Sequence, residues 1–507
     1  MAASSVSNPT RIASQTGYLL AGNLFTLAAG LPLQIYISRT LGASGLGMYG
    51  LLEAVAAVLM GVLGLGVAQT AVRFIPHHIE RQEFDAVRRL VRGGIAVILL
   101  AGVAGYAMFA AGHGVFVNVW PEFEGHGSSI LLYALTLPLG LFLHFLAQCL
   151  RGLLEVRQVV IATSFLQFSI KAAIAVSLLG LGLGLYGYIA AIVASQLIAT
   201  GWLAWTLLRQ FSLLPRGDAP TAGGAGQNWL QYARVMYAGS LLSVSASHLD
   251  RFLIGFLVNP AMVGILMIAK TLHGLPAVFL QLFIIAAGPL FAAANAREDG
   301  NARQTLYHLT TDWLVRLGAP LILFLALFAE PVLRLFGEEF AREGVSALWL
   351  LLLGQAVNLG SGQIGNLLNM SGLERAMLRI SVQSTALLLL ALPPLVYGFG
   401  IAGAAAALSA SIVYNNLAAL FVARREIGLR WSDARYRQWV APGLAATAVA
   451  VLLRMNLDAP GAAVLVAALL AVYAVFHAAH LAQGLNDEDR QLWSALQARL
   501  RVQRQPS

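Results

Sequence analysis

Charged residues are scarce in this chain of 507 residues: only 11% are Asp, Glu, Lys or Arg, while 58% are hydrophobic. A soluble globular domain carries about 25% charged residues, so the composition excludes that class. The mean hydropathy of +0.74 is typical of a polytopic membrane protein. The net charge is +9, but the basic residues lie in short loops between apolar runs. That distribution indicates membrane topology and not a nucleic acid partner.

Cysteine and lysine are nearly absent as well. The single Cys149 excludes a disulfide framework and a cysteine metal cluster. His77 and His78 have no neighbours at metal-ligand spacing, so we expect no metal and no cofactor. The only lysines, Lys171 and Lys270, both lie inside apolar runs, and neither follows a glycine. A phosphate loop ending in Gly-Lys-Ser/Thr is therefore excluded, and with it a nucleotide motor of that type.

Long apolar runs dominate what is there. A helix needs about 20 residues to cross the hydrocarbon core, and we count fourteen runs near or above that length. The sequence thus predicts an all-α polytopic membrane protein with fourteen transmembrane helices. The predicted spans are 16–37, 47–70, 93–117, 128–149, 158–180, 185–208, 234–258, 261–291, 313–336, 345–369, 378–399, 400–423, 438–457 and 460–482.

Arginines set the expected orientation. With the N-terminus inside, the even-numbered loops hold nineteen arginines and the odd-numbered loops hold four. The excess of positive charge on one side predicts that both termini face the cytoplasm. The four exceptions on the outer side are Arg39, Arg334, Arg342 and Arg454.

Two duplicated landmarks predict an internal repeat. Laying Gly264 on Gly47 aligns two apolar helices that are each followed by a polar turn and a glycine-opened helix. GLGLYGYIAA and GFGIAGAAAA match when Gly187 is laid on Gly403, which shifts the numbering by nearly the same amount. Because six spans separate the copies, we expect two six-helix lobes related by an axis along the membrane normal, plus two extra C-terminal helices.

The repeat also sets the expected domain boundaries. We expect an N-lobe over 1–208, a Pro/Gly-rich cytoplasmic linker over 209–233 and a C-lobe over 234–423. Helices 13 and 14 would occupy 424–482. The tail over 483–507 could form an amphipathic cytoplasmic helix or remain solvated without a specific role.

The stretch SHLDRFLIGFLVNPAMVGILMIAKTLH carries the strongest functional signal. It lies within apolar spans but contains His248, Asp250, Arg251, Lys270 and His273. Ionisable residues at bilayer depth cost a few kcal/mol each, so they normally face a protein-lined or watery interior and mark a transport pathway.

Glu53 and Lys171 are predicted to lie at the same membrane depth as these ionisable residues. Counted from the outer ends of their spans, Glu53, Lys171, Asp250, Arg251 and Lys270 lie roughly 9 to 15 Å deep at the helical rise. We expect Lys171, Arg251 and Lys270 to bind an anionic head group, and Glu53 and Asp250 to serve ion coupling or charge balance. The alternative is that Asp250 and Arg251 pair only to fix helix packing. Polar residues expected to line the same cavity are His144, Gln148, Gln167, His248, His273, Gln355 and Asn358.

Several segments together resemble a known family. RTLGASGLGMYGLLEAV, LDRFLIGFLVNPAMVGILMIAKTL, LFAEPVLRLFGEEF, LLLGQAVNLGSGQIGNLLNMSG and GFGIAGAAAALSASIVYNN are similar to the polysaccharide-transporter branch of the multidrug/oligosaccharidyl-lipid/polysaccharide flippase superfamily. The resemblance runs from about Thr16 to Gly428. It implies two six-helix lobes around a central cavity that opens alternately to the two sides. Helices 13 and 14 would correspond to the additional helices of flippases for lipid-linked sugars.

One departure concerns the substrate. The first span offers Asn23 and Gln34 where a lipid II flippase would be expected to present basic residues of its arginine-rich cavity. The peptidoglycan precursor is therefore not the substrate that we expect.

The resemblance implies a flippase in the bacterial inner membrane that moves a polyprenyl-diphosphate-linked oligosaccharide to the outer leaflet. Its partners would be the lipid-linked oligosaccharide, membrane lipids and the glycan polymerase and glycosyltransferases of the pathway. The competing interpretations are a cation-coupled multidrug exporter, a membrane-embedded glycan polymerase or ligase, and a scaffold for a synthase. The short outer loops argue against a polymerase or ligase, because such enzymes need a sizeable external loop for their catalytic residues.

Overall fold

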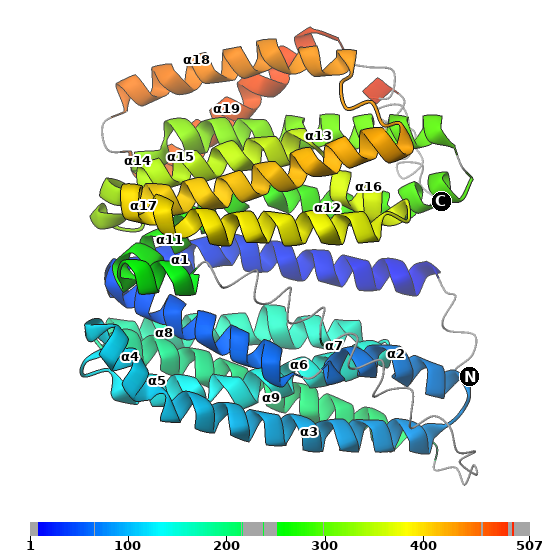
Figure 1. Cartoon of the computed structure of the whole chain (residues 1–507), viewed down its shortest axis with the longest axis vertical. Coiled ribbons are helices and arrows are strands. Elements are labelled where there is room, and N and C mark those ends of the chain that lie inside the picture. Colours follow the sequence, from blue (N-terminus) through cyan, green and yellow to red (C-terminus); the bar gives the residue numbers. More distant parts are fainter. Residues whose placement is uncertain are drawn as a thin grey trace, which may run out of the picture. The chain divides into compact units, whose positions relative to one another are not determined.

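The computed structural model describes residues 9–64, 66–213, 215, 237, 251–297, 299–457, 460–484 and 489–490. Among these residues every regular element is helical and none is a strand, which confirms the expected all-α class. The chain divides into two compact units, Met1–Met267 and Ile268–Ser507. Figure 1 shows long helices packed side by side within each unit.

Unit 1 contains the predicted first half of the chain. Its helices α2, α3, α6 and α9 surround a core that includes Ile75, Phe145 and Leu150. The elements are α1 (Pro9–Leu63), α2 (Val67–Glu80), α3 (Phe84–Ala111), α4 (His113–Val119), η1 (Pro121–Phe123), α5 (Gly127–Ala134), α6 (Thr136–Gly152), α7 (Val156–Val160), η2 (Ile161–Leu166), α8 (Gln167–Gly180) and α9 (Gly184–Leu213). Residues 251–257 add a further helical segment.

Unit 2 begins inside α11 (Pro260–Gly274) and contains the C-terminal helices. Phe291, Tyr307 and Leu367 form part of its core. The elements are α12 (Ala277–Ala296), α13 (Gly300–Leu327), α14 (Ala329–Arg334), α15 (Glu338–Gly360), α16 (Ile364–Met370), α17 (Glu374–Ile427), η3 (Ala434–Trp439), α18 (Val440–Asn456) and α19 (Ala462–Ala482). The predicted domain boundaries stay a prediction, and most of the expected linker lies outside the described residues.

The described helices account for most of the expected membrane crossings. Ten of them are long and apolar enough to cross a membrane, or eleven if the bent pair Pro260–Gly274 and Ala277–Ile284 is one span. Two of the ten join two helices across a kink, α1 at Gly42 and α17 at Gly400. Multi-pass insertion is therefore established for the described part of the chain, while the total of fourteen crossings stays a prediction.

The backbone repeats at the second pair of sequence landmarks. Gly184 has a φ of 50° at the start of α9, and Gly400 has a φ of 56° at the break in α17. Each of these glycines lies three positions before its landmark, Gly187 or Gly403, so the same alignment superimposes them. Glycine occupies both positions because positive φ brings Cβ of other residues into steric conflict. The two halves of the chain therefore share a left-handed glycine at this position.

A second repeated feature ends the helix α6 in unit 1 and α16 in unit 2. Leu154 and Gly372, which lie at nearly the same offset along the chain, have φ values of 61° and 78°. Around them the same hydrogen bonds close the helix: Glu155 N–H donates to the Leu150 carbonyl at 2.8 Å, and Leu373 N–H donates to the Leu368 carbonyl at 3.0 Å. A left-handed residue with this six-to-one bond is the Schellman ending.

The first pair of landmarks meets inside unit 1. A Cβ atom added to Gly47 would lie 1.6 Å from the Pro260 carbonyl oxygen, and one added to Gly264 would lie 2.1 Å from the Ala43 carbonyl oxygen. Ala43 precedes Gly47 by four positions, just as Pro260 precedes Gly264. The contact is thus reciprocal between equivalent positions. Only glycine permits such close backbone approach between membrane helices.

Candidate functional site

An ion pair between distant segments marks the candidate site in unit 1. The Arg251 guanidinium donates to the Glu53 carboxylate, which projects from the second half of α1. The two side chains are 21% and 34% exposed, so both remain within reach of a ligand. Arg251 Nε is buried and has no hydrogen-bond partner among the described residues. The pair therefore neutralises much of the Arg251 charge but leaves one of its donors unused.

Aromatic packing positions the segment that carries Arg251. The Trp120 indole N–H donates to the Gly255 carbonyl at 2.6 Å, and its ring meets Phe252 edge to face at 6.2 Å. Trp120 follows α4 and is itself buried. Apolar rings that surround a buried polar bond strengthen it, because water cannot compete for the donor. The loop beside α4 thus holds Arg251 in register with Glu53.

Tyrosines lie one helical turn from Glu53. Tyr49 precedes Glu53 by four residues on α1, and its ring contacts Tyr188 at 5.0 Å and Tyr133 at 6.1 Å. Tyr133 and Tyr188 are both buried. These rings give the ion pair an apolar wall on the side of α1 that faces the interior of unit 1.

Lys171 follows an irregular helical segment. Residues Ile161–Leu166 form a π-helix between α7 and α8, and Lys171 lies on α8 with its amino group 5.4 Å from the Phe168 ring centre. Lys171 is half-buried, and it is close enough to Glu53 for the two charges to interact. Single π-helical turns within α-helices occur frequently at functional sites. The structure thus brings Glu53, Arg251 and Lys171 into one charged region of unit 1.

The other predicted site residues of unit 1 lie outside that region or outside the description. Gln167 is half-buried at the start of α8, next to the π-helix. His144 is exposed on α6, and Gln148 accepts a hydrogen bond of 3.4 Å from Arg151. His248 and Asp250 lie outside the described residues.

Lys270 and His273 lie on α11, within unit 2. Both are half-buried, and His273 Nε2 is buried without a hydrogen-bond partner among the described residues. Local sequence explains where this helix begins: Asn259 caps it by accepting from the Met262 N–H at 2.9 Å, and Pro260 occupies the first helical position. Asparagine and proline are favoured at these positions because they satisfy or remove unpaired N–H groups.

Gln355 and Asn358 belong to a neutral polar network within unit 2. Asn358 Nδ2 donates to Gln355 Oε1 at 3.3 Å, and Asn416 Nδ2 donates to Asn358 Oδ1 at 3.2 Å. The Ser361 hydroxyl donates to Asn416 Oδ1 at 2.6 Å, and the Tyr307 hydroxyl donates to the Ser361 carbonyl at 3.0 Å. Gln355 is only 1% exposed. The network joins α13, α15 and α17.

Sequence reasoning missed a charged cluster beside the C-terminal helices. Arg316 pairs with Asp312 on α13 and with Asp489 at 2.6 Å. The Trp439 indole N–H donates to Asp312 at 2.7 Å, and Asp312 is buried. The i, i+4 spacing of Asp312 and Arg316 could have revealed the pair, but the predicted span began at residue 313 and left Asp312 in a loop.

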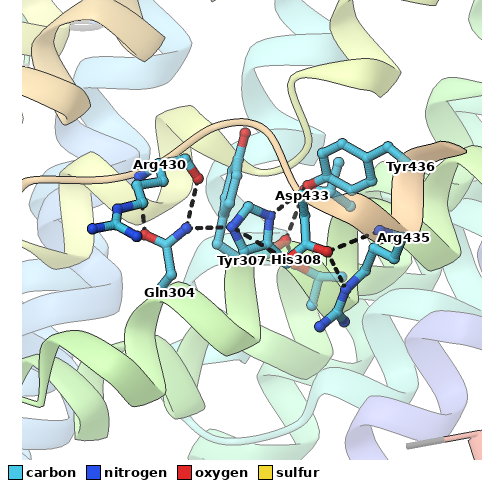
Figure 2. A network of polar contacts seen from close by, with 9 residues as sticks. Gln304, Tyr307, His308, Arg430, Asp433, Arg435 and Tyr436 are labelled. Atoms are coloured by element: carbon cyan, nitrogen blue, oxygen red, sulfur yellow. Dashed lines mark hydrogen bonds and ion pairs between the residues drawn. The ribbon is translucent and has the colours of Figure 1, made fainter. Parts of the chain in front are cut away.

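The segment after α17 is fixed on α13 by polar contacts, which Figure 2 shows. The Gln304 amide donates to the Arg430 carbonyl at 2.6 Å and accepts from its N–H at 2.9 Å. His308 Nδ1 lies 2.7 Å from the Tyr436 hydroxyl. Burial raises the pKa of Asp433, but the backbone N–H and guanidinium of Arg435 outweigh it and hold that pKa below its usual value. Asp433 therefore stays ionised in this segment.

Surface cavities also occur in the described part of unit 2. One of about 480 Å³ lies between the two halves of α17, near its ends. Its basic lining residues are Arg375, Arg379 and Arg425, and its one acidic lining residue is Glu426. Another, of about 520 Å³, is lined by the ends of α13 and α18, by α14 and by the start of α15. Both volumes fall within the range of about 300 to 1,000 Å³ common for small-molecule sites.

The fold defines a class of membrane protein. The transporters of the MOP superfamily share it. A multidrug resistance transporter of the MATE family in an inward-facing conformation superposes with a TM-score of 0.65 at 16% identity, over 80% of this chain and 94% of its own. The lipid II flippase MurJ in an inward closed conformation gives 0.65 at 14% identity, over 91% and 98%. A MOP superfamily transporter from Pyrococcus furiosus, described by the reverse polarity of its binding pocket, gives 0.58 at 14% identity, over 82% and 95%.

Sequence narrows the class to a family. Residues 12–295 match the family described as polysaccharide biosynthesis protein, which is more than half of the chain. The chain therefore belongs to that family, and the resemblance noted in the sequence is confirmed. No curated protein matches the sequence. Among the solved structures that share the fold, two are described as a multidrug resistance transporter and a lipid II flippase.

Proposed function

We propose that this protein translocates a polyprenyl-diphosphate-linked oligosaccharide from the cytoplasmic to the outer leaflet by alternating access. The protein would lie in the bacterial inner membrane with both termini in the cytoplasm. The sugar and the diphosphate need a polar route through hydrocarbon, whereas the prenyl tail can remain in lipid. The family match and the likeness to a lipid II flippase support a lipid-linked substrate.

One observation carries the proposal: unit 1 holds a partly exposed charged region formed by residues of apolar helical segments. Arg251 keeps a buried, unused donor beside Glu53, and Lys171 lies near the same carboxylate. Buried donors and charges at bilayer depth are costly unless a ligand or partner uses them. Arginine and lysine are the side chains that bind phosphate oxygens most readily. We assign Lys171, Arg251 and Lys270 to the anionic head group.

Glu53 would balance these cations between transport steps. Its carboxylate pairs with Arg251. A diphosphate that enters the cavity would compete with Glu53 for that guanidinium. We propose that Asp250 shares the role of charge balance or ion coupling, and that His144, Gln148, Gln167, His248, His273, Gln355 and Asn358 provide polar contacts in or near the cavity.

The test uses purified protein in lipid vesicles with a fluorescent lipid-linked oligosaccharide in one leaflet. Transfer to the other leaflet is measured by an impermeant quencher. Replacing both Lys171 and Lys270 with Ala should abolish transfer, because two of the proposed phosphate contacts are lost. Arg297→Ala removes an exposed positive charge elsewhere and serves as the matched control. Near-normal transfer by the folded double variant would reject the assigned role of the lysines.

The structural similarity to a multidrug transporter supports a second candidate function, which the same vesicle assay can test. A cation-coupled exporter would move organic cations across the vesicle membrane and would depend on Glu53. In that case Glu53→Gln should abolish cation transport, while the lysine variants should retain it. Against this function, Glu53 is already paired with Arg251, which leaves it little charge for an organic cation. The glycan polymerase and glycosyltransferases of the pathway are the protein partners that we propose.

A further inference from the structure

Unit 2 holds an outer cavity that the proposed transport site does not use. It has a volume of about 520 Å³, and its walls come from the last residues of α13, from α14, from the start of α15 and from the end of α18. Figure 1 shows α14 and the end of α18 at the same end of unit 2. By the arginine distribution along the chain, this is the outer end of the spans.

Arginines that depart from the positive-inside rule line this cavity. Four arginines fall on the outer side of the membrane against the general rule, and three of them, Arg334, Arg342 and Arg454, line this one cavity. Basic residues beside spans oppose outward insertion. Three that converge from separate elements despite that cost indicate a function for positive charge at this place.

Ion pairs hold two of these arginines in fixed positions. Glu330 accepts from Arg334 at 2.7 Å and from Arg454 at 3.1 Å, and Glu338 contacts Arg334 Nε at 3.1 Å. The cavity wall therefore presents guanidinium donors and carboxylate acceptors side by side, already oriented. Sugar hydroxyl groups both donate and accept hydrogen bonds, so they can use both kinds of partner on such a wall.

One face of α15 supplies the other wall. Arg342, Val345 and Trp349 recur at i, i+3 and i+7, and all three line the cavity. Arg342 is exposed and makes no ion pair within the part of the chain that the structure describes. The Trp349 side chain is 53% exposed, but its indole N–H donates to the Ala326 carbonyl at 2.8 Å, which fixes the ring.

We propose that this cavity is an outer binding site for the translocated glycan, specific for a sugar that carries a carboxylate. The sugar carboxylate pairs with Arg342, the apolar face of the ring stacks on Trp349, and hydroxyl groups bond to the Glu330 and Arg334 side chains. Arginine binds a carboxylate through two parallel hydrogen bonds, and an aromatic ring offers an apolar platform at low entropy cost. This inference rests on the proposed function, since it assigns the site to the glycan after its transfer.

The experiment measures binding of water-soluble disaccharides to the full-length protein in detergent, by calorimetry. The probes are a disaccharide that contains glucuronic acid and its neutral glucose counterpart. Wild-type protein should bind the acidic probe more tightly. Arg342→Gln should weaken the acidic probe about tenfold and leave the neutral one unchanged, whereas Trp349→Leu should weaken both.

Matched controls separate the cavity from general charge and aromatic effects. Trp431 is 55% exposed and lies outside the cavity, so Trp431→Leu should leave both affinities unchanged. Arg425→Gln removes an exposed arginine at the opposite end of unit 2 and should also have no effect. If Trp349→Leu does not fold, as judged by thermal denaturation, Trp349→Phe and Arg342→Gln carry the test.

Three outcomes would overturn the inference. The first is equal affinity for the acidic and neutral probes, and the second is an Arg342→Gln variant that binds like wild type. The third is displacement of the acidic probe by vesicles of phosphatidylglycerol but not by excess disaccharide, which would make the cavity a lipid head-group site. Leaflet transfer of the lipid-linked oligosaccharide, measured separately, reports on the proposed function, so a failure of one does not imitate a failure of the other.

Discussion

Each unit contains one connected set of polar groups within its spans, and these two sets differ in kind. Unit 1 has a charged set, Glu53, Arg251 and Lys171, whose members are half-exposed. Unit 2 has a neutral set around Asn358 and Asn416, largely buried and joined by hydrogen bonds. Both halves have a glycine with positive φ at an equivalent position, Gly184 and Gly400. Unit 2 contains charged groups as well, Lys270 and the Asp312–Arg316 pair, but its Asn358–Asn416 network is neutral.

Because one set is charged and the other neutral, the free-energy cost of burying the side chains differs between them. A neutral amide whose hydrogen bonds are made inside the protein stabilises packing and gains little from a ligand. A charged side chain at the same depth is paired only in part, and an incoming ion of opposite sign can replace its partner. We therefore expect changes in the charged set of unit 1 to act chiefly on transport, and loss of Asn416, which is not among the proposed cavity residues, to act chiefly on stability.

Among the single substitutions that test this comparison, the largest effect should come from breaking the charged pair. Arg251→Ala leaves Glu53 without its partner and removes a proposed phosphate contact. Loss of one member of a hydrogen-bonded charge pair costs about 2 to 5 kcal/mol, and partial exposure favours the lower end. We expect leaflet transfer to fall about 30-fold. The double variant Glu53→Gln and Arg251→Gln should regain thermal stability but not transfer; recovery of transfer would show that the pair serves packing alone.

A smaller effect, and one of the opposite kind, should follow from Asn416→Ala in the neutral network. The Ser361 hydroxyl and the Asn358 side chain would each lose a partner inside unit 2. Unsatisfied buried polar groups cost about 1 to 3 kcal/mol. Thermal denaturation should occur at lower temperature, while transfer per folded molecule should stay unchanged. Asn456→Ala, at the exposed end of α18, is the control. A loss of transfer without a loss of stability would place ligand contacts in unit 2 as well.

The smallest effect compares equivalent helix ends. At Gly372 a Cβ atom would meet nothing within 4 Å, so Gly372→Ala changes only the backbone energy of a residue at φ 78°. The expected loss of stability is about 1 kcal/mol, measured by denaturation. Gly274→Ala is the matched control, because its Cβ is equally unobstructed and its φ is not positive. Equal stability of the two variants would mean that the left-handed ending is not maintained in unit 2.

Much of the fold could be predicted because glycine marks positions where the backbone needs a positive φ or a close helix approach. Gly187 and Gly403 gave the correct offset, and the positive φ values at Gly184 and Gly400 share it. Apolar runs likewise identified the described spans, since hydrophobic length is set by the bilayer. The π-helix at Ile161–Leu166 could not be predicted, because a single extra residue in a turn hardly changes the pattern of apolar residues.

The candidate site could be predicted only in its residue types. Charge inside an apolar run revealed Glu53, Lys171 and Arg251, but the pairing of Glu53 with Arg251 joins positions 198 residues apart and depends on helix packing. The burial of polar residues could not be predicted from the sequence either. Gln355 and Asn358 are polar residues in an apolar run, and the hydrogen bonds that join them to Asn416 on α17 depend on helix packing. Asp312 was missed because the predicted span began at residue 313, whereas the helix α13 begins at Gly300.

The attachment of Asp489 to Arg316 bears on how the protein is handled in the laboratory. Asp489 follows α19 in the chain, and its carboxylate meets a guanidinium that is almost fully buried on α13. A form shortened after Gly484, or one whose affinity tag replaces the residues beyond it, would leave that guanidinium with Asp312 as its remaining carboxylate partner within the described residues. Purification handles are better placed at the other terminus, and digestion at the C-terminal end should be slower in the intact protein than in an Asp489→Ala form.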